Sequence, residues 1–366
     1  MPAYKDQNKG TWYCKFVYKD WQGNKKHKCK RGFKTKREAL EYEQDFKVDK
    51  ADDVDMSFEI FVKKYKEDLY PRIRLSTSIT KDHIIDNLIT PFFINKKISE
   101  ITSRDVIRWQ NTLIGKINPH TGKRYKSSYL KTVHNQLSAI FNFGVRFYSL
   151  KTNPAAQAGN MGSEKDIKVD FWTETEYYKF RDVMMDDPFY YYIFETLYWT
   201  GIREGELLAL QVSDINFKDN TISIDKTYQV LRGEPVITPP KTPQSVRVVT
   251  MPSFLADELK DYIGMIYKPK ADERLFPSSK SCITNCLKTG AKKAGIKTIR
   301  VHDLRHSHVS LLINNGYSPM AIGARVGHKS IDITYRYAHM FPNVQKDLAA
   351  TLNDIAIGGD NYVGKE

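Results

Sequence analysis

The amino-acid sequence predicts a multidomain α+β protein with three segments. Residues 1–50 are expected to form a small β-sheet with one helix, and residues 56–155 an all-helical segment. Residues 170–366 are expected to form a mixed, mainly helical segment with a small antiparallel sheet. The length of 366 residues is enough for two or three domains, and the hydrophobic content of 41% is that of an ordinary folded protein.

The first segment carries strand patterns. Residues 11–18 (TWYCKFVY) alternate aromatic and polar positions, as a half-buried strand does. Turn-forming residues follow at 20–24, and residues 25–33 (KKHKCKRGF) predict a second strand. Thr35 is expected to cap the helix that comes next.

The positive charge of the chain is concentrated at its N-terminus. Residues 1–37 hold 12 Lys/Arg and 2 Asp/Glu, within a chain whose net charge is +14. Charge of this sign and density favours a polyanionic partner, most simply nucleic acid, and a small basic sheet fits a DNA groove. A solvated basic hairpin without a specific partner is the alternative. An anionic membrane surface usually requires a basic amphipathic helix with an apolar face.

The second segment shows helical periodicity in four stretches, residues 57–70, 76–93, 101–114 and 127–148. The expected N-caps are Ser57, Ser76, Thr102 and Ser127. Basic residues lie near the expected helix ends, where phosphates could be met: Arg72, Arg74, Lys81, Arg104, Lys123, Arg124 and Lys126. A helical packing domain without ligands would look the same. The polar, Gly-containing stretch after Asn153-Pro154 predicts a linker.

Other features bear on location. The N-terminus lacks the apolar stretch of a signal peptide, and no run of about 18 apolar residues occurs. A cytoplasmic protein without a membrane partner is therefore expected. The four cysteines, Cys14, Cys29, Cys282 and Cys286, are expected to be reduced thiols.

Two motifs in the third segment hold isolated cations. Arg203 lies in the stretch TGIREGEL (residues 200–207), where an arginine among apolar neighbours is costly unless it binds an anion or a carboxylate. An ion pair with Glu206, three residues on, is the alternative. Lys241 lies between two strand-like runs, where a lysine at a hairpin tip could reach a neighbouring groove.

Two further motifs follow. In HDLRHSH, His302 and Arg305 are three residues apart and share a face if the segment is helical. Zinc binding by His302 and His306 is an alternative, although the glutamate of the metalloprotease motif is absent. The stretch from Gly327 through His328 to TYRYAH contains two tyrosines, which alone would indicate only packing.

In combination these motifs resemble the tyrosine recombinase family, also called phage-type integrases. That family has an arginine in a T-G-x-R-x-x-E-L setting, a hairpin lysine, H-x-x-R, G-H and a tyrosine. The sequence carries each element in order, as Arg203, Lys241, His302 with Arg305, His328 and Tyr337. The resemblance extends to the N-terminal segments. It implies an arm-type DNA-binding domain over residues 1–50, a core-binding domain over 56–155 and a catalytic domain over 170–366.

The resemblance implies that a tyrosine attacks a DNA phosphodiester and leaves a 3′-phosphotyrosine link, without ATP, metal or cofactor. The family places the nucleophile nine residues after the G-H histidine and two before a histidine, which selects Tyr337 over Tyr335. Arg203 and Arg305 would grip the non-bridging oxygens. Lys241 would be the general acid, His302 would assist proton transfer, and His328 would donate a hydrogen bond to the phosphate. Glu206 would orient Arg203.

The implied partners are double-stranded DNA at core-type and arm-type sites and three further copies of the chain, which together form a homotetramer. Accessory DNA-bending or directionality factors are also implied, as is the docking of a C-terminal helix, with Val344, Leu348, Leu352 and Ile355 at helical spacing, on a neighbouring protomer. The expected function is integration or excision of a phage or mobile element. A type IB topoisomerase and a non-catalytic DNA-binding repressor are the alternatives, and the basic N-terminal segment favours recombination. A metal-dependent nuclease is disfavoured because no carboxylate cluster accompanies the histidines.

Overall fold

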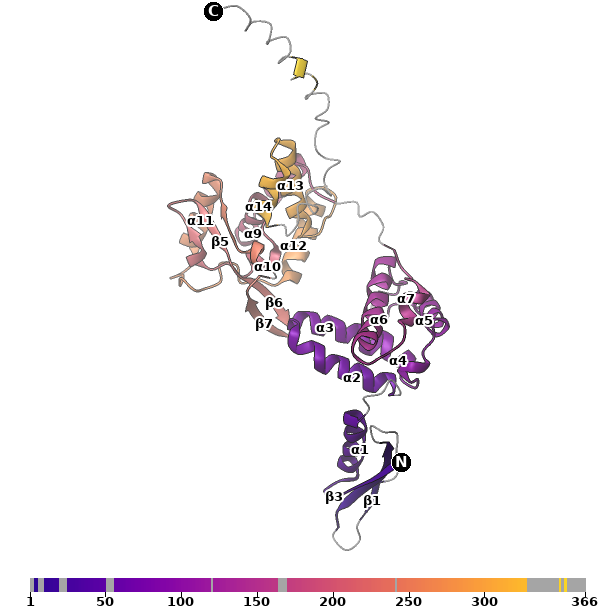
Figure 1. Cartoon of the computed structure of the whole chain (residues 1–366). Helices are drawn as coiled ribbons and strands as arrows, with labels where there is room; N and C mark the ends of the chain where they lie inside the picture. Colours follow the sequence, from indigo (N-terminus) through magenta and orange to yellow (C-terminus); the bar gives the residue numbers. More distant parts are fainter. Residues whose placement is uncertain are drawn as a thin grey trace, which may run out of the picture. The chain divides into compact units, whose positions relative to one another are not determined.

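The computed structural model confirms the α+β class (Figure 1). The residues that the structure describes are 3–5, 10–19, 25–50, 56–119, 121–163, 170–240, 242–327, 349 and 352–353. The chain divides into two compact units, residues 1–167 and residues 168–366. None of the helices within the described ranges is long and apolar enough to cross a membrane.

The N-terminal segment is a three-stranded antiparallel sheet with one helix. Its elements are β1 (Ala3–Lys5), β2 (Trp12–Lys19), β3 (Lys25–Phe33) and α1 (Lys36–Lys50). The two predicted strands are confirmed, whereas the short β1, which pairs with β2, was not predicted. The predicted cap is also present, because the Thr35 hydroxyl accepts a hydrogen bond from the Glu38 amide at 3.1 Å.

Residues 56–119 and 121–163 are mainly helical. The α-helices are α2 (Phe58–Leu69), α3 (Leu75–Ile84), α4 (Thr90–Phe93), α5 (Ser103–Gly115), α6 (Ser127–Phe147) and α7 (Pro154–Ala158). A π-helical turn, Ile85–Ile89, joins α3 to α4. The apolar faces meet in one core that includes Phe58, Trp109 and Phe141, and the Trp109 indole donates to the Leu88 carbonyl at 2.7 Å.

Two of the four predicted caps in this segment are confirmed. The Ser57 hydroxyl accepts from the Ile60 amide, and Thr102 forms a capping box with Asp105. The predictions for Ser76 and Ser127 are wrong. Each lies inside its helix, because the extended residue that ends the preceding loop is Arg74 in one case and Lys126 in the other.

The second unit combines helices with two small sheets. Its α-helices are α8 (Glu174–Met184), α9 (Pro188–Thr200), α10 (Glu204–Leu207), α11 (Ser253–Met265), α12 (Lys280–Lys293), α13 (Asp303–Asn314) and α14 (Pro319–Val326). One antiparallel sheet has the order β4-β5-β8, from β4 (Ile215–Asn216), β5 (Thr221–Ile224) and β8 (Arg247–Thr250). The pairing of β5 with β8 joins the two strand-like runs that the sequence indicated.

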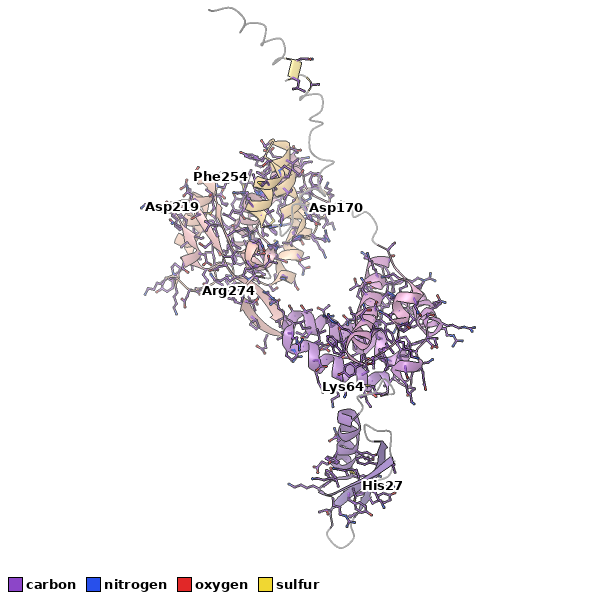
Figure 2. The ribbon with its side chains drawn as sticks, in the orientation of Figure 1. His27, Lys64, Asp170, Asp219, Phe254 and Arg274 are labelled. Carbon is purple, nitrogen blue, oxygen red and sulfur yellow. The ribbon has the colours of Figure 1, made fainter. Side chains whose placement is uncertain are left out.

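A hairpin of β6 (Thr227–Leu231) and β7 (Glu234–Thr238) was not predicted. Its turn is Arg232-Gly233, and both residues have positive φ. The guanidinium of Arg274 (labelled in Figure 2) lies over the Tyr228 ring of β6, 4.1 Å from its centroid. Lys241 does not lie in the turn of this hairpin. It follows β7 and precedes β8 in the chain, and it lies outside the described residues.

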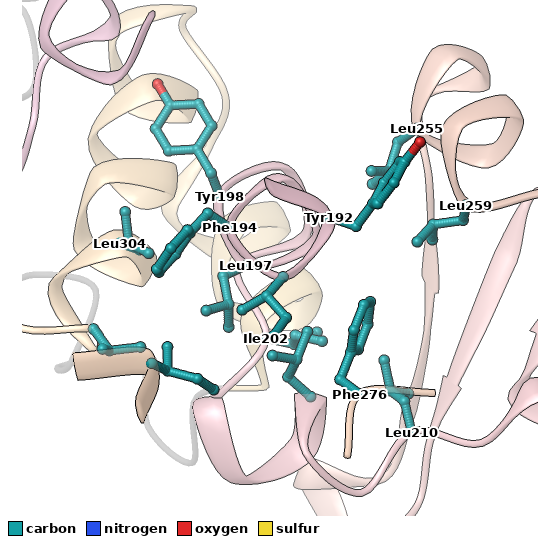
Figure 3. Packing of buried hydrophobic residues seen from close by; sticks show 14 of the residues in the cluster. Tyr192, Phe194, Leu197, Tyr198, Ile202, Leu210, Leu255, Leu259, Phe276 and Leu304 are labelled. Atoms are coloured by element: carbon teal, nitrogen blue, oxygen red, sulfur yellow. The ribbon is translucent and has the colours of Figure 1, made fainter. Parts of the chain in front are cut away.

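Helix α9 runs through the core of the second unit and is buried on most of its surface (Figure 3). Figure 3 shows Phe194 and Leu197 on the side of Leu304 in α13, and Tyr192 on the side of Leu255 in α11. Burial of one such side chain stabilises the fold by roughly 1.5–3 kcal/mol. The segment that follows α9 therefore starts from a rigidly held helix end.

Candidate active site

A glycine ends α9 and directs the chain into the TGIREGEL motif. Gly201 has a left-handed backbone, with φ of +65°, and its amide donates to the Leu197 carbonyl at 3.0 Å. A Cβ at this position would lie 2.5 Å from the Cδ2 atom of His308. The motif needs glycine here because both the backbone conformation and the lack of space exclude a side chain.

Arg203 is the residue immediately before α10 and is held by that short helix. Its amide and its Nη1 atom donate to the two carboxylate oxygens of Glu206, at 2.9 and 2.7 Å. Its Nη2 atom donates to the Gly327 carbonyl at 2.9 Å. The predicted ion pair between Arg203 and Glu206 is thus present. With 36% of its side chain exposed, Arg203 also faces solvent.

Glu206 is buried and receives a second arginine. The Nη2 atom of Arg247 donates to Oε2 at 2.9 Å, and its Nη1 atom lies 3.3 Å from Oε1. Burial alone would raise the pKa of the Glu206 carboxyl, but the hydrogen bonds and charges of Arg247 and Arg203 bring that pKa below its ordinary value. The carboxylate is therefore ionised and shared by two guanidinium groups.

Arg305 reaches the same place from α13. Its side chain is buried, and it donates from Nη1 to the Gly201 carbonyl at 2.7 Å and from Nη2 to the Val326 carbonyl. The accepting carbonyls of Val326 and Gly327 are consecutive, at the end of α14. The structure thus directs Arg203 and Arg305 to consecutive carbonyls of the chain.

His302 is the N-cap residue of α13 and is exposed. Its ring lies edge-on to that of His306, with the centroids 5.2 Å apart. Desolvation, together with the charge of Arg305, lowers the pKa of His302. This lower pKa favours the neutral imidazole, which is the form that can accept a proton.

The remaining predicted site residues, Lys241, His328 and Tyr337, lie outside the described residues, as does Tyr335. His328 directly follows Gly327, the residue whose carbonyl accepts from Arg203. The C-terminal helix that the sequence predicts also falls almost wholly outside the described ranges.

The other two histidines of HDLRHSH lie at structural positions. Burial, with the neighbouring His302, lowers the pKa of His306 to about 4. His308 is buried, and its Nε2 atom accepts from the Arg325 Nε atom at 3.0 Å. Within the described ranges, no group of three or more His, Cys, Asp or Glu side chains is arranged to hold a metal ion.

The sequence motifs did not identify two arginines of this site, Arg247 and Arg325. Arg325 donates to the carbonyls of Thr250 and Trp199, both at 3.0 Å. The sequence did contain a signal for Arg247, because this arginine interrupts the apolar run SVRVVTM at the start of a strand. A buried strand seldom carries a guanidinium unless a carboxylate or several carbonyls receive it.

Three family models match the chain. The phage integrase family model matches residues 173–343, and an arm DNA-binding domain model matches residues 2–50. The N-terminal SAM-like domain of phage integrases matches residues 57–114. The matches follow the three segments in order along the chain.

Known integrases and tyrosine recombinases are similar to this chain over most of their length. The ICEBs1 integrase of Bacillus subtilis is 30% identical over 343 residues, which cover 88% of this chain and 90% of that protein. A XerC-like tyrosine recombinase of Caldanaerobacter subterraneus is 25% identical over 293 residues, covering 71% of this chain and 73% of that protein.

Solved structures show the same fold. The Tn1549 transposon integrase in complex with a circular intermediate DNA aligns with a TM-score of 0.67 at 18% identity, covering 82% of this chain and 99% of that one. A lambda integrase dimer bound to a core site aligns with a TM-score of 0.58 at 18% identity, covering 92% and 93%.

The fold, the paired arginines and these relatives define a tyrosine recombinase, an enzyme that acts on DNA. The resemblance seen in the motifs is confirmed. The chain belongs to the phage integrase family.

Proposed function

We propose that the chain cuts and rejoins DNA at specific sites, with Tyr337 as the nucleophile, and so integrates or excises a phage or mobile element. The tyrosine hydroxyl attacks the scissile phosphorus, the 5′-oxygen leaves with a proton, and a 3′-phosphotyrosine link remains. Because the link keeps the energy of the broken bond, a 5′-hydroxyl of the partner strand can reverse the step without ATP.

The observation that carries this proposal is the convergence of Arg203 and Arg305 on the adjacent carbonyls of Val326 and Gly327. Two guanidinium groups that donate to consecutive carbonyls suit the two non-bridging oxygens of a phosphodiester, whose charge grows in the transition state. Arg203 donates from Nη1 to Glu206 and from Nη2 to Gly327. Because a guanidinium has five N–H groups, its remaining N–H groups can donate to a phosphate as well.

The proton-transfer roles follow from the order of the motifs and from the neutral imidazole of His302. A neutral imidazole next to two arginines can take the proton of the tyrosine hydroxyl as that hydroxyl attacks. Lys241 is assigned as the general acid for the 5′-oxygen. His328, next to the carbonyls that receive Arg203 and Arg305, is assigned as a hydrogen-bond donor to the phosphate.

The same proposal includes the domain roles and the assembly. Residues 1–50 would bind arm-type sites, residues 56–155 core-type sites, and residues 170–366 would carry out the chemistry, on DNA in the cytoplasm. Another integrase, that of lambda, forms a tetramer bound to a Holliday junction, and its structure aligns with a TM-score of 0.56. We assign a tetramer on two duplexes to this chain as well, with accessory DNA-bending or directionality factors and a C-terminal helix that docks on the neighbouring protomer.

The test uses a duplex taken from DNA that flanks the gene and chosen because the protein binds it. The duplex carries a nick, so that the cut strand diffuses away and the covalent adduct is trapped. Wild type, Tyr337→Phe and the matched Tyr335→Phe are incubated with it in EDTA and run on a denaturing gel. A covalent adduct with wild type and Tyr335→Phe, but not with Tyr337→Phe, is expected. An adduct with Tyr337→Phe would move the nucleophile, and no adduct with wild type would support the repressor alternative.

A further inference from the structure

Arg247, the first residue of β8, is a buried arginine outside the predicted catalytic set. Only 7% of its side chain is exposed. Its guanidinium donates to Glu206, to the Arg325 carbonyl from Nε at 2.9 Å, and to the Ser245 carbonyl from Nη1 at 2.9 Å. A guanidinium whose three nitrogens all donate to protein oxygens is held in one position.

The contacts of Arg247 lead to both phosphate-binding arginines. Through Glu206 it is one carboxylate away from Arg203. Through the Arg325 carbonyl it touches the end of α14, and the next two carbonyls along the chain accept from Arg305 and Arg203.

Two details tighten this arrangement. A Cβ on Gly327 would lie 3.2 Å from Arg247 Cδ and Nη1, so the glycine leaves room for the guanidinium. A second bond runs in the other direction between the same two elements, because the Arg325 side chain donates to the carbonyl of Thr250, the last residue of β8. The strand and the end of α14 are therefore tied at two points.

We propose that Arg247 is a positioning residue for strand cleavage, which holds the Glu206 carboxylate so that Arg203 is aimed at the scissile phosphate. This inference rests on the proposed function. Glu206 bonds to the amide and to the guanidinium of Arg203, so a shift of the carboxylate moves both. In a preorganised site, a displacement of this kind lowers the rate and leaves binding largely intact.

The first measurement compares Arg247→Lys with Arg274→Lys on the nicked duplex described above. Lysine keeps a positive charge beside Glu206 but loses the fork that reaches the two carbonyls. Arg274 is the matched control, because it also donates to backbone carbonyls, those of Leu208, Phe276 and Ser278, and has no bond to Glu206 among those that the structure records.

The cleavage rate at saturating DNA should fall about 10- to 100-fold in Arg247→Lys and less than about threefold in Arg274→Lys. The Kd for DNA should change by less than about threefold in both variants. Melting temperature, measured in parallel, separates a loss of folded protein from a loss of rate.

Two further readouts distinguish positioning from simple stabilisation. If Arg247 acts through Glu206, the double variant Arg247→Lys/Glu206→Gln should cleave within about threefold of Glu206→Gln alone, because effects along one chain of contacts are not additive. A methylphosphonate at the scissile position removes the charge that Arg203 neutralises. The rate ratio of wild type to Arg247→Lys should therefore shrink on that substrate.

A wild-type rate in Arg247→Lys would overturn the inference, and so would fully multiplicative losses in the double variant. The same holds for an unchanged ratio on the methylphosphonate. Each of these outcomes leaves wild-type cleavage and the Tyr337 assignment intact. Absence of a wild-type adduct on a bound duplex would instead remove the proposed function, and the inference with it.

Discussion

The two basic regions of this chain hold their positive charge in opposite ways. In the N-terminal segment, Lys30, Lys34 and Arg37 are exposed, over a small core that consists of Ala3, Cys14, Phe16 and Ala39. At the candidate active site, Arg247 and Arg305 are buried and bonded to carbonyl or carboxylate oxygens beside one of the large cores of the molecule.

This difference distinguishes charges that attract DNA from charges that are held in a fixed direction. Exposed charges attract a polyanion by their number, are screened by salt within about 10 Å at 0.1 M, and tolerate exchange of one cation for another. Buried guanidinium groups act through direction, so that the fork matters as much as the charge. Four predictions test this contrast, from the largest expected effect to the smallest.

The largest effect is expected from a substitution that keeps the charge. Arg305→Lys should lower the cleavage rate by about 100- to 1000-fold, because lysine cannot reach both Gly201 and Val326 and still face a phosphate. The same change at Arg31, on the exposed strand β3, should alter DNA affinity by less than about twofold. Single-turnover cleavage and gel-shift titration measure the two. Comparable losses in both variants would contradict the contrast.

The next effect comes from a pair of glycines with the same backbone conformation. Gly201→Ala should lower the free energy of unfolding by about 2–4 kcal/mol, because the new Cβ meets His308 in a left-handed backbone. Gly10 in the N-terminal segment has the same φ of +65° and nothing within 4 Å of an added Cβ. Gly10→Ala should therefore cost about 1 kcal/mol, from backbone strain alone. Denaturant unfolding checks both, and equal costs would refute the packing argument.

Removal of residues 1–50 should weaken binding to a long DNA site by about tenfold or more and leave cleavage of a short core duplex unchanged. The slope of log K against log salt should become shallower by about 0.9 for each phosphate that the N-terminal segment neutralises. Gel shifts over a salt series provide the measurement. An unaltered slope would mean that the exposed lysines and arginines do not bind phosphate.

The smallest effect is expected from pH. Burial holds the pKa of His306 at about 4, below its ordinary 6.5, so between these values the unfolded chain binds the extra proton. Folding stability should therefore be retained above pH 6.5 and decline as the pH falls toward about 4. His306→Gln should lose less stability than wild type between about pH 7 and about pH 5 in thermal melts. Identical declines would exclude His306 as a cause.

Interactions between residues close together in the sequence were enough to predict much of the fold and part of the site. Alternation predicted β2, and the turn residues at 20–24 predicted a second strand, β3, after it. Side-chain capping predicted the starts of α1, α2 and α5, and spacing predicted the pairing of Arg203 with Glu206. These features depend on neighbours within a few residues, which the sequence displays directly. The short strand β1 and the β6–β7 hairpin escaped prediction because short strands owe their stability to pairing more than to composition.

Only the tertiary structure decided how the arginines meet. Arg203 bonds to a carbonyl 124 residues away, and Arg247 bonds to a carboxylate 41 residues away. No local period reports such partners, because they depend on how α9, α13, α14 and β8 pack around a common core. The sequence by itself determined which cations the enzyme carries, whereas packing determined their direction, since a buried guanidinium settles wherever the fold supplies oxygens to receive it.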